Sequence, residues 1–252
     1  MPNNFETIES RLRLARRDNS KELDLSGCNL TSLPNYIGQL YQLQSLNLSD
    51  NKLSELPNSI GQLYQLQDLN VSYNNLTTLP NSIGQLSQLK SLDASYNNIS
   101  TLPNAVGQLS QLQNLNLYRN NLSNLPSSIE KLSQLHYIHL SHNSFSILPN
   151  SISQLSQLKS LKLYRNNLST LPDIFEKLYQ LEDLDVSNNI LSTLPNSISQ
   201  LSQLKSLKLQ RNNLSILPDI FEKLYQLEVL DVSNNILSIL PDSIGQLSQL
   251  KF

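Results

Sequence analysis

The sequence has little of several residue types, and each shortage excludes a class of protein. Its only cysteine among 252 residues is Cys28, so an intrachain disulfide is excluded and no oxidising compartment is indicated. Charged residues make up 15%, below the ~25% of typical domains, and the net charge is −2. A balance so near neutral gives no reason to expect nucleic acid or an anionic membrane as partner. No apolar run approaches the ~18 residues that indicate a membrane span.

Residue patterns that support catalysis or cofactor binding are also scarce. The six glycines form no phosphate-binding loop, and the sequence contains no Gly-x-Ser-x-Gly. His136, His139 and His142 are close in sequence, but residues three apart in a strand point to opposite faces, so we expect no metal site. The opening residues lack the basic start and apolar stretch of a secretory signal. We therefore expect a non-catalytic, cytoplasmic chain without a cofactor.

What the sequence does contain is a repeat. Ten Leu-Pro pairs recur at intervals of 23 residues, from Leu33-Pro34 to Leu240-Pro241. The stretch around Leu46 and Leu48 alternates apolar and polar residues, which is the period of a strand with one buried face. One repeat cannot bury its apolar side chains alone, whereas stacked repeats form a continuous core. The repeat unit reads Leu43-x-x-Leu46-x-Leu48-x-x-Asn51-x-Leu53-x-x-Leu56-Pro57-x-x-Ile60-x-x-Leu63.

This pattern resembles the leucine-rich repeat family, in the 23-residue form of the intracellular Ras-group proteins and of the bacterial Roco proteins. The resemblance covers roughly residues 20–252, and the opening is similar to Roco N-termini, with Ile8–Ala15 leading into Lys21–Gly27. It implies an α/β fold: a curved leucine-rich repeat solenoid with a parallel β-sheet on the concave face. Short 3-10 or irregular helical turns are expected on the convex face. A bacterial source is favoured, and a eukaryotic one stays open.

The two ends of the chain give different expectations. Residues 1–19 are expected to form an N-terminal helical cap, because residues 4–17 place Phe5, Ile8, Leu12 and Ala15 on one helix face. Residues 20–252 then hold ten repeats and the start of an eleventh. No C-terminal cap is visible, so we expect that edge either to continue into further chain, which we favour, or to associate with a second copy.

A column of asparagines is expected to be structural. These residues are Asn51, Asn74, Asn97, Asn120, Asn143, Asn166, Asn189, Asn212 and Asn235. Each follows a strand at a point where the backbone turns inward and needs hydrogen-bond partners, which an amide side chain can supply. Cys28 stands in this column in the first repeat, as an expected buried small residue. We predict that Asn143→Ala lowers the free energy of unfolding by more than ~1 kcal/mol.

In two columns, each made of one residue from every successive strand, the charge alternates from one strand to the next. One holds Lys162, Asp185, Lys208 and Asp231, and the other holds Lys159, Glu182, Lys205 and Glu228. The spacing predicts ion pairs across strands rather than acid–base catalysis. These residues lie in two almost identical segments, 155–200 and 201–246, which differ at six positions. Both segments carry Asp-Ile-Phe-Glu-Lys-Leu, a better helix former than the Asn-Ser-Ile-Gly-Gln-Leu of other repeats.

The expected concave face becomes rich in tyrosine, arginine and histidine in the middle repeats. The candidate partner-binding residues are Tyr96, Tyr118, Arg119, Tyr137, His139, His142, Tyr164, Arg165 and Arg211. Tyrosine and arginine are enriched at binding hot spots. Arg119, His142 and Arg165 share one column, so a carboxylate or phosphate of an acidic partner could be held there.

The sequence therefore predicts a protein–protein interaction module that binds on its concave face and acts as a signalling scaffold. Two alternatives stay open. One is the recognition domain of a Roco-type protein, whose GTPase domain would lie beyond Phe252. The other is a bacterial effector that binds host proteins.

Overall fold

The computed structural model describes residues 8–251, and over that range the predicted solenoid is confirmed. One helix, α1 (Ile8–Arg17), precedes ten three-residue strands. The strands form one parallel sheet in sequence order, with neighbours in register so that Leu23 pairs with Leu46 and Leu46 with Leu69. They are β1 (Glu22–Asp24), β2 (Ser45–Asn47), β3 (Asp68–Asn70), β4 (Ser91–Asp93), β5 (Asn114–Asn116), β6 (Tyr137–His139), β7 (Ser160–Lys162), β8 (Asp183–Asp185), β9 (Ser206–Lys208) and β10 (Val229–Asp231).

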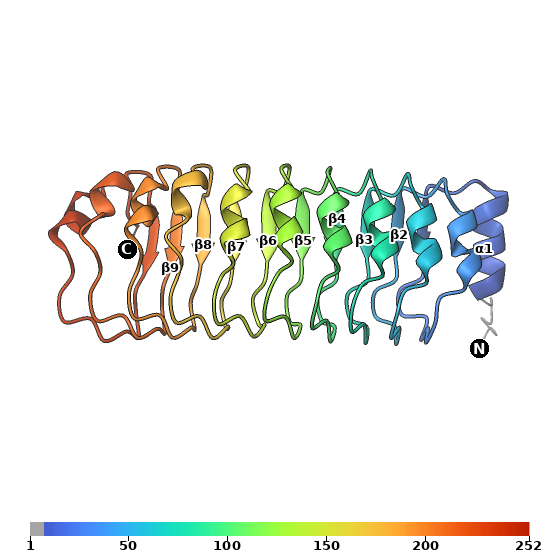
Figure 1. The fold of residues 1–252 in the computed structure, drawn as a ribbon, viewed down its shortest axis with the longest axis horizontal. Coiled ribbons are helices and arrows are strands. Elements are labelled where there is room, and N and C mark those ends of the chain that lie inside the picture. The colour runs from blue at the N-terminus through green and yellow to red at the C-terminus, as the bar shows by residue number, and fades with distance from the viewer. Residues whose placement is uncertain (1–7, 252) are drawn as a thin grey trace.

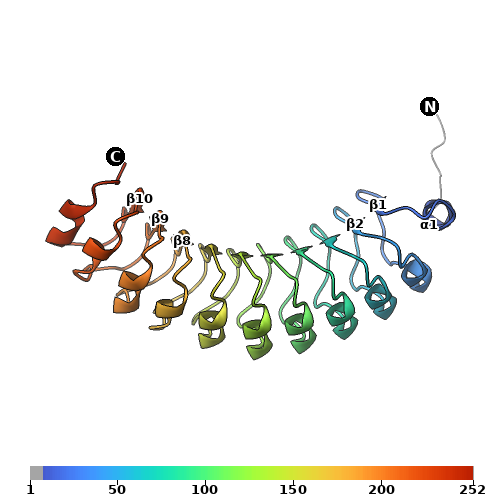
Figure 2. The same ribbon diagram turned by 90° about the horizontal axis from the view of Figure 1, so that it is seen from above.

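Each strand is followed by a short 3-10 turn on the opposite side of the solenoid. Eight turns span five residues and start directly after the Leu-Pro proline, whose extended backbone sets the entry to the turn. They are η1 (Asn35–Gln39), η2 (Asn58–Gln62), η3 (Asn81–Gln85), η4 (Asn104–Gln108), η5 (Ser127–Lys131), η6 (Asn150–Gln154), η8 (Asn196–Gln200) and η10 (Asp242–Gln246). The solenoid is curved, with the sheet on the inner side and the turns on the outer side (Figures 1 and 2).

The remaining two turns are shorter, although their residues are the better helix formers. The turns η7 (Phe175–Lys177) and η9 (Phe221–Lys223) span three residues each. Ile174, which precedes η7, has φ −121° and ψ −2°, outside the helical range. Phe175 is fully buried and Ile174 packs partly buried against the core. Because two adjacent apolar side chains are both turned inward here, packing overrides helix propensity.

The core is a continuous column of leucines between the sheet and the turns. In the second repeat Leu46, Leu48, Leu53, Ile60 and Leu63 are all buried, and the same positions are buried in every following repeat except the last, where four of the five are only partly buried. Burying such a side chain contributes about 1.5–3 kcal/mol relative to leaving it exposed. Each repeat therefore depends on its neighbours for stability, since these side chains have no other apolar cover.

The asparagine column connects each repeat to the one before it. Asn51 accepts a hydrogen bond from the Leu30 N–H at 2.9 Å and donates to the Leu25 and Leu48 carbonyls, also at 2.9 Å. Asn143 repeats this arrangement at 2.9–3.0 Å. Cys28, in the same column, is only partly buried; its Sγ accepts from Arg11 at 3.5 Å and donates to the Ser26 carbonyl at 3.4 Å. A thiol cannot span both neighbours as an amide does.

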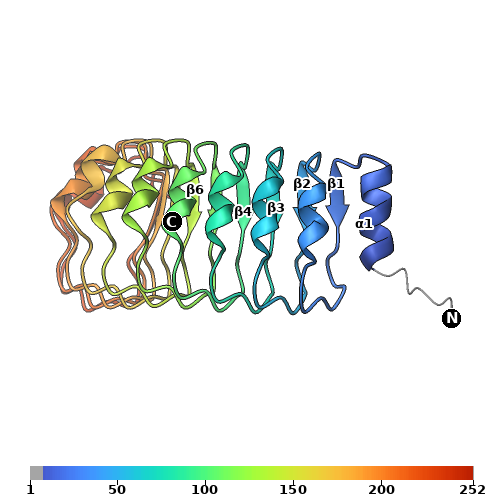
Figure 3. The same cartoon turned by 45° about the vertical axis from the view of Figure 1, so that its right-hand side comes forward.

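The two ends of the described chain differ in how they are covered. The helix α1 lies against the first repeat, as Figure 3 shows, and its Leu12 and Ala15 are buried. Of the expected cap residues, Phe5 lies outside the described range. In the last repeat Leu240 is 49% exposed, whereas the equivalent Leu56 is 5% exposed. No described helix has the length and hydropathy needed to cross a membrane.

Candidate functional site

The backbone becomes left-handed three residues after the end of every strand in residues 8–251. The ten residues at this position have φ between 52° and 62°. The geometry lets the N–H at this position bond the next repeat, as from Arg119 to the Ser141 carbonyl at 2.9 Å and from His142 to the Tyr164 carbonyl at 2.9 Å. The ten residues, in order, are Gly27, Asp50, Tyr73, Tyr96, Arg119, His142, Arg165, Asn188, Arg211 and Asn234.

Only some of these residue types suit that conformation. Glycine, asparagine and aspartate adopt left-handed backbone readily, whereas other L-residues lose about 1–2 kcal/mol there. Six of the ten positions carry tyrosine, arginine or histidine, and these six all lie between Tyr73 and Arg211. Sequence reasoning missed the conformation. The tolerant residues Gly27, Asp50, Asn188 and Asn234 in one column were the signal that could have indicated it.

Aromatic rings close over the centre of the concave face. Tyr118 and Tyr164 are two repeats apart, yet their ring centroids are 6.1 Å from each other. The repeat between them carries Ser141, which is 0% exposed and whose hydroxyl accepts a hydrogen bond from the Tyr164 N–H at 3.1 Å. The small side chain leaves room for both rings to lean inward. Sequence order alone did not predict this contact.

The same two tyrosines enclose two histidines. The Tyr118 ring lies 4.9 Å from His139 and 5.0 Å from His142, and Tyr164 lies 5.8 Å and 5.3 Å from the same rings. The expectation that histidines three apart diverge is therefore wrong for this pair. The strand β6 ends at His139, so the alternation of a strand does not extend to His142, which sits in the left-handed turn. Among residues 8–251 no group of three His, Cys, Asp or Glu side chains is arranged to hold a metal ion.

Burial shifts the ionisation of this aromatic cluster. Burial, and then hydrogen bonding to Tyr164, raises the pKa of Tyr118 to about 12. Burial, and then the Lys162 charge, lowers the pKa of His139 to about 4. The pKa of His142 is lowered by burial and then by the Arg165 and Arg119 charges. Both imidazoles are therefore neutral at pH 7, and the exposed positive charge of the cluster belongs to the two arginines.

The cluster extends along the solenoid toward the N-terminus. Tyr118 meets Tyr96 edge to face at 5.1 Å, and Tyr96 stacks on Tyr73 at 4.0 Å with 13° between the ring planes. The Arg119 guanidinium carbon lies 5.3 Å from the Tyr96 ring centroid, a cation–π distance. The rings and the arginine form one connected surface over β3 to β7.

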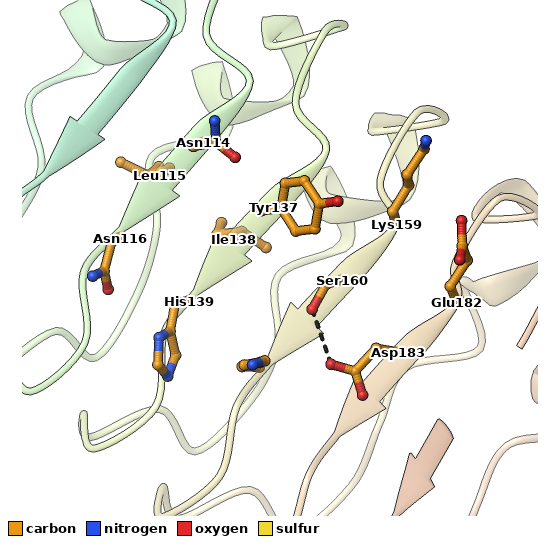
Figure 4. A pocket seen from close by; sticks show the side chains of 11 residues that line it. Asn114, Leu115, Asn116, Tyr137, Ile138, His139, Lys159, Ser160, Glu182 and Asp183 are labelled. Atoms are coloured by element: carbon orange, nitrogen blue, oxygen red, sulfur yellow. Dashed lines mark hydrogen bonds between the residues drawn. The ribbon is translucent and has the colours of Figure 1, made fainter. Parts of the chain in front are cut away.

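Beside the cluster lies a shallow hollow of about 450 Å³ over β5 to β8. Tyr137, His139 and Lys159 line it, together with Ser160 and Asp183, whose side chains are hydrogen bonded at 3.1 Å (Figure 4). Tyr137 is 51% exposed and forms no ring contact with the described aromatic side chains. The structure thus places Tyr137 on the same face as the cluster but apart from it.

In the column of Lys159, Glu182, Lys205 and Glu228 only one of the predicted ion pairs forms, and among the described residues Lys159 has no salt bridge. Lys205 pairs with Glu182 at 2.6 Å, and Lys251 pairs with Glu228. Among the described residues Lys162 and Lys208 form no salt bridge, so the prediction for their column is wrong. The reason is local: Asp185 accepts hydrogen bonds from the Ser187 N–H at 3.0 Å and hydroxyl at 2.6 Å. These two bonds hold the Asp185 carboxylate on its own turn.

The nine candidate residues therefore fall into three groups. Tyr96, Tyr118, His139, His142 and Tyr164 are brought together with Arg119 and Arg165, and we call these seven residues the central patch. Tyr137 borders the hollow. Arg211 lies two repeats beyond Arg165 in the same left-handed column.

Family models of the leucine-rich repeat region match residues 8–116 and 83–186, and a leucine-rich repeat model matches residues 180–201, 203–224 and 226–247. The chain belongs to the leucine-rich repeat family. No curated protein matches it. The matches indicate no enzymatic family, and they support the leucine-rich repeat family as a whole rather than its Ras-group or Roco branch.

Solved structures of the family are similar to the chain. YopM, a leucine-rich effector of Yersinia pestis, is 31% identical, with 99% of this chain and 66% of that one covered and a TM-score of 0.78. A leucine-rich repeat protein of Leptospira interrogans is also 31% identical, over 95% of this chain and 85% of that one, with a TM-score of 0.58. A TDR receptor is 31% identical over 95% of this chain, with a TM-score of 0.84, and the chain spans 44% of its length.

Proposed function

We propose that the chain is a non-catalytic protein-binding module and that its partner contacts the central patch of the concave face. The observation that carries this proposal is the choice of residues at the left-handed positions. Asparagine or glycine would be more stable there, yet the central repeats carry tyrosine, arginine and histidine. Residues that reduce stability at exposed positions persist where their side chains serve a function.

The charge of the patch favours an acidic partner. Arg119 and Arg165 are exposed, and neither forms a salt bridge within the described residues. Arginine binds carboxylates and phosphates in a bidentate geometry, and the neighbouring tyrosines supply rigid apolar area around it. His142, neutral between the two arginines, adds no charge of its own at pH 7.

The experiment removes the two arginines without straining the backbone. Asparagine suits the left-handed conformation, so we expect Arg119→Asn with Arg165→Asn to abolish capture of the partner from a lysate of the source cell while the melting temperature stays equal or rises. Lys131→Asn with Lys177→Asn, on the convex side, removes the same charge and should leave capture unchanged. A partner captured at full yield by the arginine variant would contradict the proposal.

Other observations bear on the cellular location of the chain and on the kind of protein to which it belongs. We propose a cytoplasmic location, because the single thiol Cys28 has no disulfide partner, and a role as a signalling scaffold. A bacterial effector that binds host proteins is the second candidate, favoured by the similarity of 99% of the chain to the Yersinia pestis effector. A module in a Roco-type protein is the third. Capture from lysates of the source cell and of a host cell distinguishes the effector from the other two.

The apolar side chains of the last repeat are less buried than those of the repeats before it. Leu240 is exposed there, and Leu230, Val232 and Leu237 are only partly buried, although the equivalent side chains of the repeats before it are buried. We propose that further polypeptide covers this edge, with a second copy of the chain as the alternative. Light scattering across a range of concentrations tests the alternative, since a second copy would double the mass.

A further inference from the structure

Three arginines form a regular row along the concave face. Arg119, Arg165 and Arg211 follow β5, β7 and β9, at exact two-repeat intervals of 46 residues. Their φ values are 55°, 54° and 56°, so the three side chains leave the backbone in the same way. All three are exposed, and none forms a salt bridge with a described carboxylate. His142 and Asn188 fill the positions between them. We call the three residues the arginine row.

The spacing of the row follows from the geometry of the sheet. Parallel neighbours lie about 4.8 Å apart, so alternate strands place their arginines about 9.6 Å apart at the backbone. The sheet lies on the inner side of the curve (Figure 2), so side chains that project from it converge and their charged ends are spaced at or below that value. The row is thus a set of three cationic points along the solenoid axis.

We propose that the arginine row binds an acidic segment in polyproline II conformation that carries an anionic side chain at every third residue. A polyproline II helix has three residues per turn and rises about 3.1 Å per residue, so every third side chain lies on the same face about 9.3 Å further on. This matches the row in both spacing and direction. The inference rests on the proposed function and names the chemistry of its partner.

Other peptide conformations fit the row less well. In a β-strand every third residue points to the opposite face, so successive anions would alternate toward and away from the arginines. In an α-helix residues three or four apart share a face at only about 4.5–6 Å, and the next residue on that face, seven residues on, lies about 10.5 Å away. That exceeds the spacing at every step, and the concave curvature increases the mismatch.

The surroundings of the row suit the same partner. Tyr118 and Tyr164 lie beside Arg119 and Arg165 and are partly exposed, and proline-rich segments bind to aromatic-lined surfaces. Lys162 and Lys208, on the strands that precede Arg165 and Arg211, add cationic charge. Asp185 and Asp231 of the same column accept hydrogen bonds from the Ser187 and Ser233 N–H groups of their own turns, and no salt bridge joins them to these lysines among the described residues.

The test uses labelled twelve-residue peptides of identical composition, four glutamates and eight prolines. One carries glutamate at every third position and the other carries the glutamates in irregular order, and binding to the full chain is measured by fluorescence anisotropy. We expect the regular peptide to bind at least tenfold more tightly. A third peptide with phosphoserine at every third position distinguishes phosphate from carboxylate, and a helical peptide with glutamate at every seventh position tests the competing conformation.

Single variants then assign the contacts. Arg211→Asn should weaken the regular peptide three- to tenfold and leave the irregular one almost unchanged, with Lys131→Asn as the charge-matched control. Equal binding of the two glutamate peptides, or tighter binding of the helical one, would overturn the inference. If that happens while Arg119→Asn with Arg165→Asn still abolishes capture of the natural partner, the proposed function stands without it.

Discussion

Residues 155–200 and 201–246 are almost identical in sequence, and the structure gives them almost identical backbones. Arg165 and Arg211 have φ 54° and 56°, and the turns η7 and η9 are equally short. The difference that matters on the concave face is Tyr164 in the first copy and Gln210 in the second. The Tyr164 ring packs against Tyr118, His139 and His142, whereas the Gln210 side-chain oxygen is buried without a hydrogen-bond partner.

The two copies distinguish the residues that set the backbone of a repeat from the residues that form the aromatic cluster. Consensus leucines, asparagines and turn residues reproduce the same backbone in both copies, so the fold tolerates either side chain. The second copy also replaces Asp183 by Val229 and Thr193 by Ile239, both of which are exposed. The aromatic cluster therefore depends on which side chain stands at a few concave positions. It also depends on the side chains that the neighbouring repeats place beside them.

The largest expected difference between the copies concerns the asparagine column. Asn189 is buried, accepts from the Leu168 N–H at 2.9 Å and donates to the Leu163 and Val186 carbonyls. Asn189→Ala should lower the free energy of unfolding by about 2 to 3 kcal/mol in urea titrations, because these groups lose their partners out of reach of water. Asn235→Ala should lower it by about 1 kcal/mol, since Asn235 is only partly buried and water can replace it. Equal losses would show that position in the solenoid does not matter.

The second prediction exchanges the residues that distinguish the copies. Tyr164→Gln should lower the free energy of unfolding by about 1 to 2 kcal/mol, because the ring leaves three aromatic neighbours. Gln210→Tyr should raise it by less than about 1 kcal/mol, because the new ring can meet Tyr164 across Ser187 but finds Asp185 and Asn188 where His139 and His142 pack on Tyr164. Thermal unfolding of both variants measures the difference. If Gln210→Tyr raises the free energy of unfolding by as much as Tyr164→Gln lowers it, the contacts within the aromatic cluster are not what stabilises Tyr164.

The third prediction is a pH dependence that only the first copy can influence. The pKa of His139 is about 4 in the folded chain and near 6.5 when unfolded, so between these values the unfolded chain binds the proton that the folded chain rejects. Stability should therefore fall as pH decreases from about 6.5 to about 4, and His139→Asn should flatten that part of the profile.

Tyr164→Gln, which opens the cluster, should raise the pKa of His139 toward its ordinary value in an NMR titration, and Gln210→Tyr should leave it unchanged. A His139 imidazole that titrates near pH 6.5 in the unmodified chain would contradict the enclosed position.

Some of the site could be read from the sequence. The 23-residue period places Arg119, His142 and Arg165 in one column and assigns Tyr118 and Tyr164 to the concave face. It does not reveal that these tyrosines meet, because that contact depends on the size of Ser141 between them. The expected divergence of His139 and His142 failed because a three-residue strand ends before the second histidine.

By itself the sequence determined the solenoid, its buried leucine positions and the order of the side chains on each face, because a strict period gives every repeat the same environment. Only the tertiary structure decided the left-handed positions, the closure of the aromatic cluster, and the choice of Asp185 to bond its own turn rather than Lys162. Each of these outcomes is a competition between partners that are all within reach. Periodicity shows which groups are near one another, whereas distance, backbone conformation and burial decide which of them interact.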